Sequence, residues 1–269
     1  MKYQSLSWLA SINHILRDSE KQPVFPSIAS AAPPCIIRLF ERIGIPRTLE
    51  AEEPLFSPGS PVNCLVLIRK GVTARAIGSE TNKTMAISIP GRIACGNLNF
   101  FTGRSCMGNY FAIVPSEVLY IRRELLLGIV ENDAELLLHF VKTAELCALS
   151  DRMAFAALTL LPVESRLKAF YLAWAANYAR YRREPNGEGW LVMPPSLPRK
   201  YLCYLVNSSR CSLDEILKKW KASAKFSWSR SEVKIRPSLL QESWQWMREI
   251  EEPSAFRRPK EPAVAALES

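Results

Sequence analysis

The stretch that decides the fold is SLPRKYLCYLVNSSRCSLDEILKKW, from Ser196 to Trp220. Ser196 can cap a first helix that has Pro198 in its first turn, where proline lacks only an N–H that has no helical partner. Asn207 tolerates the left-handed backbone conformation that a tight break requires. The stretch therefore predicts a helix, a tight turn and a second helix.

The second helix is predicted to follow a cap at Ser209 and to run from Arg210 to about Ala222. Its apolar side chains recur at helical spacing and are expected to face a core. They are Leu213, Ile216, Leu217 and Trp220. Beyond this helix, Phe226–Trp228 and Glu232–Ile235 are typical of two short strands joined by the turn Ser229–Ser231. Such a hairpin would form a small wing beside the second helix.

This segment carries most of the positive charge. The 269 residues include 35 Lys and Arg against 26 Asp and Glu, a net charge of +9. Between Ser196 and Arg236, basic residues outnumber acidic ones by ten to three. Such a concentrated field favours a polyanion such as DNA, although a solvated basic face would carry the same charge. The candidate DNA-binding residues are Arg199, Ser208, Ser209, Arg210, Cys211, Ser212, Glu215, Lys218, Lys219 and Arg230.

A long helix is predicted upstream, because Asp133–Leu158 contains neither Gly nor Pro. One of its stripes is apolar except for Glu145 and Arg152. A helix of this length extends about 39 Å, more than a compact domain can cover. The stripe would suit the seam of a parallel dimer, and packing on the chain's own domain is the alternative. The candidate interface residues are Leu138, Val141, Ala148 and Phe155.

Residues 45–122 show short apolar runs that Gly and Pro separate, the pattern of a small β-sandwich or barrel. The predicted strands are Cys64–Ile68, Met85–Ile89, Tyr110–Val114 and Glu117–Ile121. After the long helix, Pro162 marks a break, and Val163–Arg183 is predicted as a second amphipathic helix. A short strand is expected at Trp190–Met193. Residues 1–36 are expected to be an appendage with a proline-interrupted linker, and the tail after Pro253 to be disordered.

Composition excludes several classes of protein. Hydrophobic residues make up 48% and charged residues 23%, as in ordinary globular proteins. The longest apolar run, Met153–Leu161, is about half of the ~20 residues that span a bilayer. The start of the chain lacks the features of a signal peptide, and seven scattered cysteines without a C-x-x-C pair are expected to be free thiols in a reducing cytoplasm. Two histidines, with no catalytic constellation, argue against an enzyme, a metal or a cofactor.

The order of elements resembles the Crp/Fnr family of bacterial transcription regulators over about Ile43 to Leu240. Four features carry the likeness. Phe56–Gly59 with Leu65–Val72 resembles the family's glycine-spaced opening strands, and Pro90-Gly91 with Gly96–Leu98 resembles the approach to its phosphate-binding helix. Glu117–Ile121 resembles the strand before the dimer helix, and Asn207–Arg210 resembles the entry to the recognition helix. The resemblance implies an α+β fold with a jelly-roll-like β-roll, a dimerisation helix and a winged helix-turn-helix. The implied divisions are 1–36, 37–130, 131–161, 162–250 and 251–269.

The effector site departs from the family members that bind cyclic AMP. Asn97 stands where they place a glutamate, and Cys106-Met107 where they place an Arg-Ser pair. Arg104-Ser105 lies slightly earlier, so that a loop shift would restore the pair. Because Asn and Cys supply no fixed positive charge for a phosphate, we expect an effector other than cyclic AMP. Asp151-Arg152 aligns with the pair that reads adenine, and the candidate pocket residues are Gly96, Asn97, Leu98, Arg104, Ser105, Cys106, Met107, Asp151 and Arg152.

The recognition helix departs as well. Arg210 keeps the family's first reading position, whereas Cys211 replaces the usual glutamate and Glu215 a frequent arginine. The resemblance implies a cytoplasmic homodimer that binds near-palindromic double-stranded DNA and responds to a small molecule, and it allows RNA polymerase as a further partner. An effector-binding dimer that has lost specific DNA binding is the alternative. No membrane partner is expected.

Overall fold

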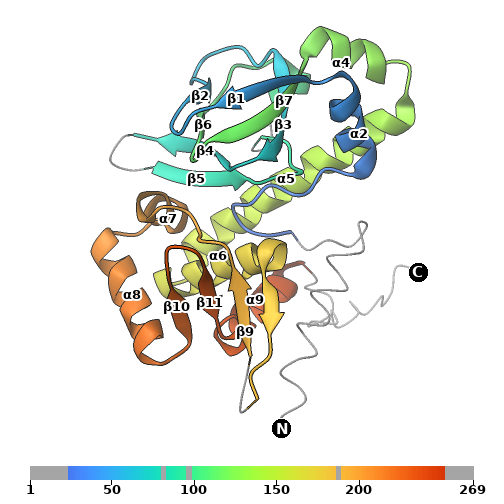
Figure 1. The fold of residues 1–269 in the computed structure, drawn as a ribbon. Coiled ribbons are helices and arrows are strands. Elements are labelled where there is room, and N and C mark those ends of the chain that lie inside the picture. The colour runs from blue at the N-terminus through green and yellow to red at the C-terminus, as the bar shows by residue number, and fades with distance from the viewer. Residues whose placement is uncertain (1–23, 80–82, 95–98, 186–188, 252–269) are drawn as a thin grey trace, which may run out of the picture.

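The computed structural model describes residues 24–79, 83–94, 99–185 and 189–251. Figure 1 shows an upper body rich in strands and a lower body of helices with a small sheet, and α5 (Ala134–Leu160) runs obliquely from the first to the second. The structure therefore has the predicted α+β order of a β-roll, a long helix and a C-terminal helical domain.

Two antiparallel sheets form the β-roll, with strand orders β1-β7-β3 and β2-β6-β4-β5. Their bounds are Ile45–Leu49 (β1), Pro54–Phe56 (β2), Cys64–Lys70 (β3), Thr73–Gly78 (β4), Lys83–Ser88 (β5), Asn109–Ala112 (β6) and Ser116–Arg122 (β7). All four predicted strands are confirmed to within a few residues. Gly71 turns β3 into β4 at φ +85°, and a Cβ there would lie 2.2 Å from Ser116 Oγ, so the turn requires glycine.

Helices border the roll: α2 (Pro34–Ile43), α3 (Asn99–Thr102) and α4 (Arg123–Val130). The long helix α5 begins where the sequence predicted, because the Asp133 carboxylate accepts a hydrogen bond from Leu136 N at 2.9 Å. It ends before Pro162, which is the N-terminal cap residue of α6 (Val163–Tyr178).

The C-terminal part holds a four-stranded antiparallel sheet of order β10-β11-β9-β8 beside its helices. The bounds are Arg180–Arg182 (β8), Trp190–Met193 (β9), Arg199–Val206 (α7), Arg210–Ala222 (α8), Phe226–Trp228 (β10), Val233–Ile235 (β11), Pro237–Leu239 (η1) and Gln241–Glu251 (α9). The prediction of one helix over Val163–Arg183 is wrong at its end. The chain leaves the helix at Ala179, because the next three residues pair as β8 with β9.

The segment 24–33, expected to be a linker, is instead packed into the molecule, and we call it the strap. Val24, Phe25 and Ile28 are 2–6% exposed and belong to the same apolar cluster as residues of β4, β5, α6 and α7. Ile28 forms a parallel bridge with Ile87 of β5. The Ser150 hydroxyl of α5 lies 2.7 Å from the Phe25 carbonyl oxygen and 2.9 Å from that of Ile28. The start of the appendage and the tail that was predicted to be disordered lie outside the described residues.

Polar contacts also join the β-roll to the C-terminal part. The Arg92 guanidinium donates to the carbonyl oxygens of Ala29 and Pro90, each at 2.9 Å, and to Oδ1 of Asn177 on α6. Burial lowers the pKa of Arg92 to about 10, so it remains charged at neutral pH. Glu52, in the loop before β2, accepts from the Tyr201 hydroxyl of α7 at 2.6 Å. The two parts are therefore held together by specific bonds as well as by a shared core.

Candidate nucleic-acid interface and sensor pocket

The helix-turn-helix segment has the predicted turn and capping chemistry at Asn207 and Ser209 but not at Ser196. Asn207 takes the left-handed conformation at φ 47° and ψ 67°. The Ser209 side chain caps α8 by accepting from Ser212 N at 3.1 Å. Ser196 does not cap α7: Pro198 holds that position, and the Ser196 hydroxyl lies 3.3 Å from the Tyr171 hydroxyl. The first helix is therefore shorter at its start than predicted.

The α8 helix has one buried and one exposed face. Leu213, Leu217 and Trp220 are 0%, 7% and 1% exposed, and they attach the helix to the core. Five residues of the predicted DNA-binding set are exposed on α8: Arg210, Cys211, Glu215, Lys218 and Lys219. At 100° per residue, Cys211, Glu215 and Lys218 lie within about 60° of one another on the face opposite the core, and Arg210 lies in the first turn at the edge of that face.

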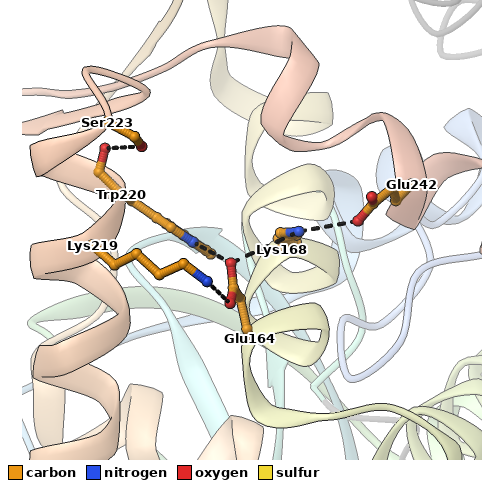
Figure 2. A network of polar contacts seen from close by, with 6 residues as sticks. All are labelled: Glu164, Lys168, Lys219, Trp220, Ser223 and Glu242. Atoms are coloured by element: carbon orange, nitrogen blue, oxygen red, sulfur yellow. Dashed lines mark hydrogen bonds and ion pairs between the residues drawn. The ribbon is translucent and has the colours of Figure 1, made fainter.

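The Lys219 side chain extends toward Glu164 of α6 (Figure 2). Its ammonium donates to Glu164 Oε2 of α6 at 2.9 Å, and the Trp220 indole N–H donates to Oε1 of the same carboxylate at 2.9 Å. The indole hydrogen bond is the main reason that the pKa of Glu164 lies below its ordinary value. Lys219 is therefore paired with α6 while its side chain stays 71% exposed, and its contact with DNA remains a prediction.

A groove of about 420 Å³ lies between α8 and the wing. Four cations line it, from α7 and α8: Arg199, Arg210, Lys218 and Lys221. Arg199 also forms an ion pair with Asp214 of α8. The wing contributes Trp228, which is 58% exposed and was absent from the predicted set. The exposure of a residue in a three-residue strand depends on its tertiary neighbours, so no sequence signal distinguished Trp228 from the buried Phe226.

The predicted wing is confirmed as an antiparallel hairpin, in which Phe226 pairs with Ile235 and Trp228 with Val233. The Ser229 hydroxyl oxygen closes its turn by accepting from Glu232 N at 3.1 Å and from Ser231 N at 3.3 Å. Arg230 is exposed at the tip of this turn. Arg230 lines a groove together with Arg210, and an exposed cation at this place suits contact with a phosphate.

Residues of the predicted effector pocket contact other parts of the chain. Arg75 of β4 donates to Asp151 Oδ1 of α5 at 2.7 Å, across the space between sheet and helix. Arg152, the other half of the predicted pair, is exposed. Asp151 is therefore paired with the sheet, and the roles of both residues in an effector pocket remain predictions.

The loop before β6 does not restore the Arg-Ser pair. Arg104, Ser105 and Met107 are exposed, and Cys106 is the residue that turns inward, at 4% exposure. Its thiol donates to the Gly108 carbonyl oxygen at 3.0 Å, and burial raises its pKa. Gly96, Asn97 and Leu98 lie outside the described residues. Arg104 and Ser105 are therefore not placed as inward-facing phosphate ligands, and a neutral thiol stands in their place.

The stripe predicted for dimerisation is uncovered on α5. Leu138, Val141 and Phe155 are 51%, 53% and 70% exposed, and Ala148 is half-buried between them. Leu160, the last residue of the helix, is also exposed, at 69%. Apolar surface of this extent along a single helix marks a site of contact with another molecule.

No protein-family model matches the chain, and no curated protein matches it. Solved structures do. FixK2 from Bradyrhizobium japonicum aligns with a TM-score of 0.65 at 13% identity, over 76% of this chain and 96% of that one. A CooA mutant from Carboxydothermus hydrogenoformans gives 0.62 at 14%, over 81% and 96%. TTHA1359 from Thermus thermophilus, a transcriptional regulator of the CRP/FNR family, gives 0.57 at 14%, over 75% and 98%. The chain has the Crp/Fnr fold.

Neither a metal site nor a membrane-spanning helix is found in the described part of the chain. No three His, Cys, Asp or Glu side chains there come together as a metal site. No helix there combines the length and the apolar character that crossing a bilayer requires. Among the cysteines that the structure describes, only Cys211 is exposed.

Proposed function

We propose that this chain is a sequence-specific DNA-binding transcription regulator of the Crp/Fnr type. The observation that carries the proposal is the exposed face of α8. Arg210, Cys211, Glu215 and Lys218 project from a helix that is capped, anchored in the core and flanked by a wing. This is the arrangement in which a recognition helix presents its N-terminal residues to the major groove.

The reading chemistry follows from the side chains on that face. A guanidinium at Arg210 can bind O6 and N7 of guanine through two parallel hydrogen bonds, and a carboxylate at Glu215 can accept from N4 of cytosine. Ser208, Ser209 and Ser212 lie around the start of the helix, and Arg199, Lys218 and Arg230 offer charge to phosphates. A thiol at Cys211 supplies no strong hydrogen bond to a base, so the operator differs from one that a glutamate there would read.

Dimerisation is part of the same proposal. The exposed stripe of α5 would pack against the same stripe of a second copy, with Leu138, Val141, Ala148 and Phe155 at the seam. Two α8 helices related by a two-fold axis would read a near-palindromic site with half-sites about one helical turn apart. We also place the dimer in the cytoplasm, with RNA polymerase as an allowed partner.

The β-roll would bind the effector, a small molecule that is not cyclic AMP. The Arg75–Asp151 ion pair and the inward Cys106 support this, because they leave no inward Arg-Ser pair for a cyclic phosphate. An effector acts only if it binds one state of the dimer better than the other. The runner-up function, an effector-binding dimer without specific DNA binding, is favoured only by the replacements at Cys211 and Glu215.

The test is selection of binding sites from a pool of random double-stranded DNA, followed by fluorescence anisotropy with the enriched and shuffled sequences. Arg210→Ala is expected to weaken binding to the enriched site by about 1–3 kcal/mol and to relax its sequence preference. Arg42→Ala on α2, an exposed cation in the β-roll part, is the matched control and should change little. Equal binding to enriched and shuffled DNA would overturn the proposal and favour the runner-up.

A further inference from the structure

Trp228 is the most exposed tryptophan in the described part of the chain, at 58%, whereas Trp174 and Trp220 are 3% and 1% exposed. A tryptophan ring gains considerable free energy when it leaves water, so an indole on the surface is a site where a partner can be bound. The wing does not need this ring for its own packing, because Phe226, Val233 and Ile235 are the wing residues buried in the core.

The surroundings of the ring are basic. The Arg199 guanidinium lies over the Trp228 ring at 5.4 Å from its centroid, a cation–π contact that ties the start of α7 to the wing. The same groove is lined by Arg210, Lys218 and Lys221 of α8. Asp214 is the only carboxylate among its lining residues, and it is already paired with Arg199. The groove thus offers unpaired positive charge along one wall and an apolar ring on the other.

A nucleic-acid backbone has the complementary pattern, since each strand alternates charged phosphates with apolar sugar edges. We propose that Trp228 is a DNA-contacting residue, and that its ring packs on a deoxyribose of the strand whose phosphates are bound by the cations of this groove. The inference rests on the proposed function and adds an apolar contact that its charged residues do not supply. The proposed contact is with the sugar–phosphate backbone, which every DNA sequence presents, so Trp228 adds affinity rather than base preference.

The affinity test uses Trp228→Ala, Trp228→Phe and a matched control. Burial of roughly 60 Å² of ring at about 25 cal/mol per Å² corresponds to about a tenfold change in Kd for Trp228→Ala, and Trp228→Phe should retain most of the affinity. Tyr181→Ala, a 39% exposed aromatic on β8 at the opposite edge of the same sheet, should change Kd by less than about twofold. The loss for Trp228→Ala should be equal on enriched and shuffled DNA.

The salt dependence separates an apolar contact from a charged one. An apolar contact releases no counterions, so Trp228→Ala should leave the slope of log Kd against log salt unchanged between about 50 and 200 mM. Arg230→Ala, which removes a charge from the same wing, should lower that slope by about one. A lowered slope for Trp228→Ala, or an unchanged Kd, would overturn the assignment of Trp228.

Quenching of tryptophan fluorescence by acrylamide measures how accessible the Trp228 ring is to solvent. Trp228→Phe should remove the most accessible part of the fluorescence of the free protein. DNA should protect that part in the wild type and protect nothing further in Trp228→Phe. Tight binding by the wild type without protection would refute the contact and leave the proposed function standing, whereas absence of DNA binding by the wild type even at low salt would end both.

Discussion

The carboxylate of Glu164 is expected to stabilise the attachment of α8 to α6 (Figure 2). It accepts from the buried Trp220 indole and from the exposed Lys219 ammonium, each at 2.9 Å. A hydrogen bond to a charged group contributes about 1.5–3 kcal/mol and a neutral one about 0.5–1.5 kcal/mol. Glu164→Gln keeps a neutral acceptor for the indole and should cost about 1 kcal/mol. Glu164→Ala leaves the indole N–H without this partner and should cost about 2–3 kcal/mol.

The pH dependence of this effect has a definite sign. The pKa of Glu164 in the folded chain lies below its ordinary value of 4.5, chiefly because of the Trp220 hydrogen bond. The stabilisation is therefore complete above the unfolded pKa and is lost as pH falls through the folded one. Glu164→Gln does not titrate, so the gap in unfolding free energy between it and the wild type should close as pH falls.

Urea titration monitored by tryptophan fluorescence, at one protein concentration, measures this gap at pH 7 and at several lower values. Glu242→Gln is the matched control, because Glu242 is 81% exposed and its ion pair with Lys168 should contribute at most about 0.5 kcal/mol. Equal losses for Glu164→Gln and Glu164→Ala, or a gap that persists in acid, would refute the role of the charge.

Two further predictions concern α5. Ser150→Ala removes the hydroxyl that binds the strap, so it should lower the free energy of unfolding by about 1–2 kcal/mol in urea titration and speed hydrogen exchange at the Ala29 amide. Thr159→Ala, whose exposed hydroxyl bonds only within α5, should do neither. Phe155→Glu places a charge in the exposed stripe and should weaken dimerisation by on the order of tenfold or more in sedimentation velocity, whereas Leu125→Glu, on an exposed position of α4 outside the stripe, should leave the dimer intact. An unchanged dimer in Phe155→Glu would move the interface elsewhere.

The features predicted correctly are those that local chemistry determines. The left-handed Asn207 and the Ser209 cap follow from what these side chains can do within a few residues of their own backbone. The same holds for the start of α5 at Asp133 and for its break before Pro162. The uncovered stripe on α5 followed from its period alone, because the stripe is too long for one domain to cover.

The errors arise where distant parts of the chain meet. The helical period places Lys219 on the surface but cannot show that α6 brings Glu164 to it. Nothing near Ala179 marks a helix end, since β8 forms only because β9 lies beside it. The strap was taken for a linker because its Pro, Ser and Ala residues are typical of one, whereas its burial depends on α5, α6 and β5 together.

These distant contacts converge on the placement of the helix-turn-helix. Arg166, one turn after the break at Pro162, donates to the Val206 carbonyl oxygen at 2.8 Å and so ties the start of α6 to the end of α7. Glu52 holds the start of α7 from the β-roll, and Arg92 holds α6 together with the strap.

On α5, successive residues face two of these attachments: Ser150 binds the strap, and Asp151 binds Arg75 of the sensor sheet. A group that displaced Arg75 would therefore act one residue away from the bond that fixes the strap. The strap in turn lies against both the β-roll and α6. The β-roll, the strap and the helix-turn-helix are thus joined by short polar links between packed elements.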